Sequence, residues 1–194
     1  MMDGFQRRRE LKKKGILEAA LELFMEHGVQ KVSISEIAKK ADVSQVTIYN
    51  YFGSKDQLAY DTVMYYTENV WHAQKQILIN PSIPYTEKLK SIIFDKKQIV
   101  TKINNEFHDF IMQIYATDEN FNRLYNEELI PHTLALFEEG KKLGYVDKNF
   151  SNEVILMYLQ MFRIFSQNTS AEQILPYTEE LMKLFLYGLS GEKK

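Results

Sequence analysis

The feature that most constrains this 194-residue chain is residues 33–58, SISEIAKKADVSQVTIYNYFGSKDQL. Apolar side chains follow the spacing of one buried helix face at Ile34, Ile37, Ala38 and Ala41. The pattern then stops at Val43, just before a second amphipathic pattern begins. The sequence therefore predicts a short helix that ends in a tight turn.

A second short helix is predicted from Ser44. It buries Ile48 and Phe52, which lie one turn apart on the same face. Because successive residues turn by about 100° around a helix, Val46 and Asn50 point away from that buried face. Two short helices joined by a tight turn form a helix-turn-helix, in which the second helix can enter a groove of DNA.

Three helix starts in this stretch carry residues that cap the free backbone amides. Ser33 is followed three residues later by Glu36, and Ser54 is followed in the same way by Gln57. Ser44 stands directly before the second short helix. The sequence thus predicts three successive helices with well-defined beginnings.

These residues resemble the TetR family of transcriptional regulators. The matching positions are Phe24, Gly28, Ser33-Ile34-Ser35-Glu36-Ile37-Ala38, Ala41-Asp42-Val43-Ser44 and Thr47-Ile48-Tyr49-Asn50-Tyr51-Phe52-Gly53-Ser54-Lys55-Asp56-Gln57-Leu58. Two positions depart from the family pattern. Asp42 replaces the usual turn glycine, which is compatible with the turn because Asp tolerates a left-handed backbone. Val46 replaces a small residue or proline, and we expect it to alter the preferred DNA sequence.

The whole chain is predicted to be all-α, with about nine helices. An N-terminal three-helix helix-turn-helix domain, residues 1–54, is joined by a long helix to a helical ligand-binding and dimerisation domain, residues 55–194. The first helix is predicted over 7–27, and the long helix ends at the segment 80–84, NPSIP. A further helical stretch opens at Asp118, and Pro131 is expected to kink or restart it. No alternating strand pattern is present.

Composition indicates a soluble protein of the cytoplasm. The chain contains no cysteine, which excludes disulfides and is compatible with a reducing compartment. No apolar segment is long enough to span a membrane, and the N-terminus does not have the pattern of a signal peptide. We therefore expect no membrane partner.

The net charge of −2 is unevenly distributed. A basic run near the N-terminus contains Arg7, Arg8, Arg9, Lys12, Lys13 and Lys14. Two interpretations are open: a solvated helix start, or a second contact with DNA beside the helix-turn-helix.

The apolar pattern of the last two predicted helices favours a homodimer. The segment VILMYLQMFRIF, residues 154–165, is apolar almost all the way round, and the segment ending in LMKLFLYGL offers a second apolar surface. One interpretation is a central helix buried within its own chain. The other, which the family resemblance also implies, is a two-fold dimer joined by these two helices and their symmetry mates.

The resemblance implies that double-stranded DNA, in the form of a palindromic operator, is the partner of the helix-turn-helix. Gln45, Val46 and Thr47 are candidates for base contacts, and Asn50 shares the outward face. Tyr49, Tyr51 and Lys55 are candidates for phosphate contacts. Ser33, Ser35 and Ser44 can add contacts to the DNA backbone, although Ser33 and Ser44 have helix capping as an alternative role.

The resemblance also implies a small-molecule effector in the larger domain that releases the protein from DNA. The abundance of aromatic residues favours an apolar or aromatic compound. The candidate wall residues are Trp71, Phe94, Phe107, Phe110, Ile111, Ile114, Tyr115, Phe121, Tyr125 and Phe162, with Gln98, His108, Gln113 and His132 as polar anchors. An alternative role for each aromatic residue is core packing.

Nothing in the sequence favours an enzyme. It has no nucleophile elbow, no phosphate-binding glycine loop and no dinucleotide-binding turn. Glu128 and His132 lie one helical turn apart, but such pairs are common on protein surfaces. We predict no catalytic residue, no metal site and no cofactor. The remaining alternative is an architectural or partner-controlled DNA-binding protein of the same fold without a small effector.

Overall fold

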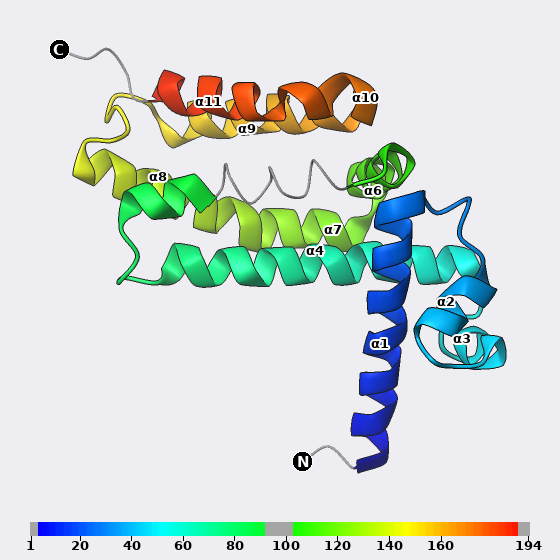
Figure 1. Ribbon diagram of the computed structural model, residues 1–194. Coiled ribbons are helices and arrows are strands. Elements are labelled where there is room, and N and C mark those ends of the chain that lie inside the picture. Colours follow the sequence, from blue (N-terminus) through cyan, green and yellow to red (C-terminus); the bar gives the residue numbers. More distant parts are fainter. Residues whose placement is uncertain (1–3, 92–102, 190–194) are drawn as a thin grey trace. The chain divides into compact units, whose positions relative to one another are not determined.

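The computed structural model describes residues 4–91 and 103–189, without the side chains of Leu186 and Leu189 (Figure 1). Within these residues the chain is helical and contains no strand. This confirms the predicted all-α class. The elements are α1 (Gly4–His27), α2 (Ile34–Lys40), α3 (Gln45–Phe52), α4 (Lys55–Ile79), α6 (Asn105–Thr117), α7 (Glu119–Leu124), η1 (Tyr125–Leu129), α8 (Ile130–Leu143), α9 (Asn152–Gln167), α10 (Ala171–Ile174), η2 (Leu175–Tyr177) and α11 (Thr178–Leu189).

Residues 85–91 form a further helical segment. Because α7 continues through η1 into α8, and α10 through η2 into α11, the described residues form nine continuous helical rods. The predicted break after α4 is found at the segment 80–84. Helix α1 begins at Gly4, three residues earlier than predicted.

The chain divides into two compact units. The first comprises Met1–Asn69 and Lys102–Ile111, and the second Val70–Thr101 and Met112–Lys194. Helices α4 and α6 each contribute residues to both units. The predicted division into a DNA-binding domain and an effector domain at residue 54 concerns function and stays a prediction.

The core of the first unit is built from the apolar faces of α1, α2, α3 and the start of α4. Phe24, Ile37, Ile48 and Leu58, one from each of these helices, are buried. Burying such side chains stabilises a fold by about 1.5–3 kcal/mol each, so together they hold the short helices α2 and α3 in place. Figure 1 shows α2 and α3 packed beside α1.

The beginning of α6 completes this unit. The ring of Phe107 lies 5.8 Å from that of Phe24, and the Asn104 amide donates a 2.7 Å hydrogen bond to the carbonyl oxygen of Met25. The Gln30 amide donates to the Glu106 carboxylate. Gly28 ends α1 with a φ of 82°, and a Cβ at this position would collide with the same carboxylate. Glycine at this position therefore permits both the chain reversal and the approach of α6.

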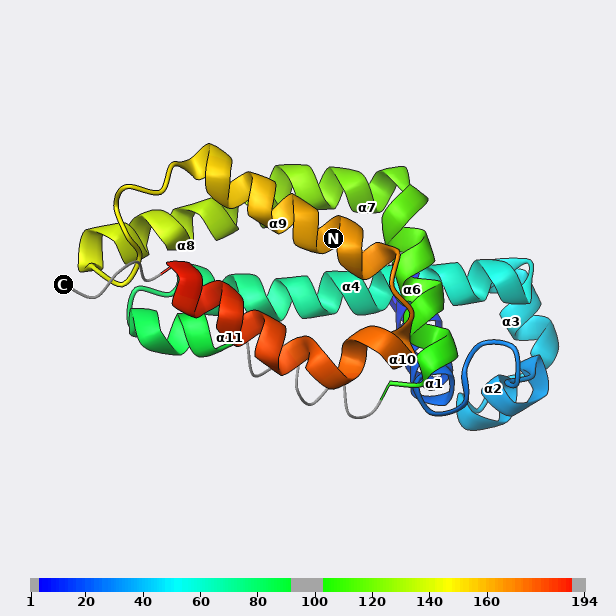
Figure 2. The same cartoon turned by 90° about the horizontal axis from the view of Figure 1, so that it is seen from above.

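The second unit surrounds two small apolar clusters. One contains Phe137, Val146 and Ile155, and the other contains Leu78, Tyr85 and Leu136. Helices α9 and α11 run next to one another in this unit (Figure 2), and Tyr158 of α9 stacks on Phe185 of α11 with ring centroids 5.0 Å apart. The stacking fixes these two helices as neighbours.

The helical stretch that opens at Asp118 contains a π-helical turn. The Asp118 carboxylate caps α7 by accepting a 2.7 Å hydrogen bond from the Phe121 amide. The turn occupies η1, and Pro131 follows within the first turn of α8. Pro131 lacks an amide hydrogen, so it is compatible with the start of a helix that follows an irregular turn. Where the sequence predicted a kink or a restart of the helix at Pro131, the structure has a π-helical turn just before this residue.

Across residues 4–91 and 103–189, no helix has the length and apolar character needed to cross a membrane.

Candidate functional site

The helix-turn-helix is held by side-chain caps at three helix starts. The Ser33 hydroxyl accepts from the Glu36 amide at 3.2 Å, while the Ser33 amide donates to the Glu36 carboxylate at 2.7 Å. The Ser33 hydroxyl also donates to the Glu36 carboxylate at 2.6 Å, and this hydrogen bond, together with the one from the Ser33 amide, lowers the pKa of Glu36. The Ser44 hydroxyl accepts from the Thr47 amide at 3.1 Å, and that of Ser54 accepts from the Gln57 amide at 3.0 Å. All three predicted caps are confirmed.

The turn between α2 and α3 depends on Asp42. Its φ is 53°, the only positive φ of a non-glycine residue in the part of the chain that the structure describes. The Val43 amide then donates to the Ala38 carbonyl oxygen at 3.0 Å and closes the turn. Asp can adopt this left-handed conformation at low cost, so the departure from glycine leaves the turn intact.

Helix α3 presents a face that the rest of its unit leaves free. Ile48 and Phe52 are buried, whereas Val46 is 67% exposed and Tyr49 is 48% exposed. Gln45 and Asn50 are exposed as well. A helix of eight residues with one buried side and one free side can enter the major groove of DNA.

Other predicted contact residues are partly engaged within the protein. Thr47 is half-buried, and its hydroxyl lies 2.8 Å from that of Ser44. The Lys55 ammonium donates to the carbonyl oxygen of Gln30 at 3.3 Å. Tyr51 is half-buried, and the guanidinium carbon of Arg9 lies 5.8 Å from the centre of its ring. The Ser35 side chain is exposed. The DNA contacts of these residues stay predictions.

The beginning of α1 borders the same surface. An open hollow of about 540 Å³ lies between α1 and the end of α3. It is lined by Phe5, Arg8, Arg9, Lys12, Asn50 and Tyr51. Three cations and no carboxylate therefore surround a hollow that includes the exposed Asn50 of α3.

The predicted effector residues are distributed over several places. Phe107 and Ile111 belong to the first unit, where Phe107 is buried against Phe24. Trp71 meets His132 edge to face, with ring centroids 5.3 Å apart. Phe94 and Gln98 lie outside the described residues. The structure places four further candidates in half-buried positions: Phe110, Ile114, Tyr125 and Phe162.

Three predicted aromatic residues gather around a residue that the prediction missed. Tyr115 and Phe121 are stacked with ring centroids 3.9 Å apart, and the guanidinium of Arg163 lies 4.1 Å from the centre of the Tyr125 ring. Burial raises the pKa of Tyr125, and the charge of Arg163 opposes that shift. Arg163 is a single cation in a nearly apolar helix, which is the sequence signal that could have identified it.

Not every hydrogen-bond donor of Arg163 has a partner within the protein. One terminal nitrogen donates to the carbonyl oxygen of Tyr115 at 3.1 Å and to the side chain of Asn122. The buried Nε has no hydrogen-bond partner in the described part of the chain, and no carboxylate pairs with the guanidinium there. A charge in such a place is usually paired, so an acceptor supplied from outside the chain would fit it.

The pair of Glu128 and His132 is used within the protein. The Glu128 carboxylate accepts from the Lys75 ammonium, which lowers its pKa, and Nδ1 of His132 donates to the Glu128 carbonyl oxygen at 2.7 Å. Among the described residues, no three His, Asp or Glu side chains gather as metal ligands would.

Helices α9 and α11 carry an exposed apolar face. On α9 its members follow helical spacing at Val154, Met157, Tyr158, Met161, Ile164 and Phe165. On α11 they are Leu184 and Tyr187. We call these eight residues the α9/α11 face. Met161 is 67% exposed and Tyr187 72% exposed, so the second unit does not cover this face with its own described residues.

Comparison with known proteins identifies the family. The pattern of "Bacterial regulatory proteins, tetR family" matches residues 16–60, which include α2, α3 and their caps. The regulator YhgD of Bacillus subtilis is 30% identical over 143 residues, which cover 70% of this chain and 72% of YhgD. This chain belongs to the TetR family. The resemblance predicted from the helix-turn-helix is thereby confirmed, and membership in a family of regulators supports the prediction that the chain is not an enzyme.

Other relatives match over part of their length. BetI of Agrobacterium fabrum is 36% identical, over 43% of this chain and 40% of BetI. YuxN of Bacillus subtilis is 28% identical, over 88% of this chain and 50% of YuxN. The chain therefore spans half or less of the length of these two TetR-family relatives.

Solved structures show the same fold. The regulatory protein TetR from Rhodobacter sphaeroides matches with a TM-score of 0.62 and 17% identity, covering 91% of this chain and 97% of that one. The repressor FadR from Thermus thermophilus, solved with lauroyl-CoA, matches with a TM-score of 0.54 and 18% identity, covering 94% and 96% of the two chains. At these identities the likeness concerns the fold alone.

Proposed function

We propose that this TetR-family protein is a cytoplasmic, DNA-binding repressor that binds a palindromic operator as a homodimer. The observation that carries the proposal is the capped helix α3, whose outward side chains Gln45, Val46 and Tyr49 are exposed while its inward side chains anchor it. Such a helix is positioned to read base edges, and flanking groups such as Lys55 contact phosphates.

Dimerisation rests on the α9/α11 face. Exposed apolar patches of this kind usually mark interfaces, and a two-fold axis would place two copies of the face against each other. Two α3 helices related by that axis would read the two halves of a palindrome, and their spacing would set the spacing of the half-sites.

The experiment that tests the proposal is the selection of genomic DNA fragments by the purified protein at one stated salt concentration. The Lys55→Ala protein serves as a comparison, because it keeps α3 and loses one cation. We expect a few palindromic sites with wild type, and weaker recovery of the same sites with Lys55→Ala. Many dispersed sites would favour the architectural alternative, and no enrichment with wild type would contradict DNA recognition by α3.

We further propose that release is caused by a small effector with an apolar or aromatic body, anchored by Arg163. Tyr115, Phe121 and Tyr125 surround this residue, and its unpaired Nε–H would donate a hydrogen bond to one carboxylate or carbonyl oxygen. Effector binding would act by favouring a conformation whose two α3 helices no longer match the operator.

A thermal-shift screen tests this effector class. Compounds with an apolar body and a single acidic group are expected to raise the melting temperature by about 5 °C or more at 100-fold excess over Kd. Arg163→Met should weaken their binding by about 10- to 100-fold, because a hydrogen bond to a charged group contributes about 1.5–3 kcal/mol. Arg123→Met, which removes an exposed guanidinium from the same unit, is the matched control. If only phosphorylated or multiply charged compounds stabilise the protein, the proposed effector class is wrong.

A further inference from the structure

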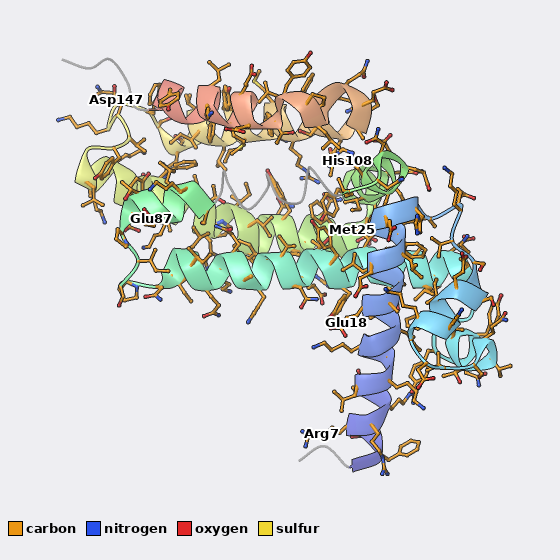
Figure 3. All side chains as sticks on the ribbon, viewed as in Figure 1. Arg7, Glu18, Met25, Glu87, His108 and Asp147 are labelled. Carbon is orange, nitrogen blue, oxygen red and sulfur yellow. The ribbon has the colours of Figure 1, made fainter. Side chains whose placement is uncertain are left out.

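The first turns of α1 carry a basic stripe that the proposed role of α3 leaves unexplained. Phe5, Arg8, Arg9 and Lys12 recur at i, i+3, i+4 and i+7, which places them on one side of the helix. No residue from 4 to 15 is buried. Figure 3 labels Arg7, which precedes Arg8 in the sequence, near the start of α1.

The cations of the stripe have no acidic partner among the described residues, whereas the two lysines that follow them do. Lys13 pairs with Asp61 at 3.4 Å and Lys14 with Glu18 at 3.6 Å. Arg8, Arg9 and Lys12 form no ion pair within the described residues. The first turn of α1 contains no acidic residue either. Because the start of a helix carries partial positive charge, a cluster of cations there destabilises the helix slightly unless anions lie nearby.

The stripe faces the surface that α3 would present to DNA. Arg8, Arg9 and Lys12 line the hollow together with Asn50 and Tyr51 of α3, and Arg9 lies over the ring of Tyr51. A polyanion that meets the outward side of α3 therefore also meets these three cations.

We infer that this basic stripe of α1 is a second DNA-contact element, which binds backbone phosphates beside the half-site read by α3. The inference rests on the proposed function. Residues 4–14 form a segment about 16 Å long, at about 1.5 Å per residue, which matches about five base pairs of duplex. Side chains that contact phosphates add affinity on all sequences and leave the preference among sequences to the base contacts.

The decisive experiment measures the salt dependence of DNA binding with two double variants. Arg8→Ala/Lys12→Ala removes two cations of the stripe, and Lys142→Ala/Lys148→Ala removes two exposed cations from the second unit. All side chains concerned are exposed, so both variants should fold like wild type. The probes are a random-sequence duplex of about 30 base pairs and a duplex recovered by the genomic selection.

We expect the slope of log K against log salt to become shallower by about 1.8 for each protomer bound when Arg8 and Lys12 are replaced, since each lost phosphate contact removes about 0.9. The ratio of affinities for the two duplexes should stay unchanged. The Lys142→Ala/Lys148→Ala slope should equal that of wild type.

The outcomes separate this inference from the proposed function. Wild-type slopes for Arg8→Ala/Lys12→Ala, or an equal loss for the control variant, would overturn the basic stripe as a contact and leave the role of α3 standing. A wild-type protein that binds the random and the selected duplex equally would overturn operator recognition, while a shallower slope in the stripe variant would still support the phosphate contact. Failure of wild type to bind either duplex would overturn both.

Discussion

Replacing Met161 with aspartate is expected to leave the chain folded, to convert it to a monomer and to lower operator affinity by on the order of 100-fold or more. Met161 is the most exposed residue of the α9/α11 face on α9. Because its side chain is free in the isolated chain, a carboxylate there costs little in the folding of one protomer.

In a dimer the same substitution acts twice. A two-fold interface uses the same patch on both subunits, so two carboxylates would be transferred from water into an apolar contact. A buried charge without a partner costs several kcal/mol, which exceeds what a modest interface can offset. Loss of the dimer also separates the two α3 helices, and the gain in affinity from binding two half-sites at once is lost with it.

The measurement is molar mass by light scattering, combined with operator affinity and circular dichroism. Ile79→Asp is the matched control, because it introduces the same charge at another exposed apolar position, the last residue of α4. A Met161→Asp protein that remains dimeric and binds the operator normally would show that the α9/α11 face is not the interface.

Local chemistry explains why the helix-turn-helix could be predicted from the sequence. Ser33, Ser44 and Ser54 each satisfy an amide three residues later, and this depends on spacing alone. The burial of Ile48 and Phe52 likewise follows from helical periodicity. Signals confined to a few neighbouring residues therefore determine α2, α3 and their turn.

Contacts between distant segments could not be read in this way. Phe107 has the helical spacing of a pocket or core residue, and only the fold shows that it lies against Phe24, 83 positions earlier in the sequence. The Asn104 amide that bonds to Met25 belongs to the same contact. A periodicity identifies which side of a helix is buried and leaves open what covers it.

The hydrogen-bond partners of polar side chains could not be predicted from the sequence either. Lys55 was predicted to contact phosphate, and in the fold its ammonium bonds to the Gln30 carbonyl oxygen, which fixes its position beside the turn after α1. Arg163 was not among the predicted site residues, because its partners Tyr115 and Asn122 lie more than 40 positions away in the sequence. The number of donors a side chain has left is a property of the packed structure.

The second large effect is expected from Val46→Glu, which should abolish operator binding and leave the melting temperature within about 1 °C of wild type. The side chain is 67% exposed on α3, so the folded protein loses little packing. In the major groove a carboxylate at this position would lie in the negative field of the phosphates on both sides, and like charges at an interface cost several kcal/mol, or on the order of 100-fold or more in affinity.

Comparison of Gln45→Ala with Lys55→Ala distinguishes residues that read bases from residues that bind phosphates. A glutamine amide can bond to both groups on one edge of adenine, and such a pair discriminates between bases by about 1–3 kcal/mol. Gln45→Ala should therefore bind operators with different bases at one position of each half-site almost equally, with an unchanged salt slope, whereas Lys55→Ala should weaken all operators and make the slope shallower by about 0.9 per protomer. Competition binding on a panel of single-base operator variants measures both effects. Equal losses on every operator from both substitutions would contradict the division of this surface into residues that read bases and residues that bind phosphates.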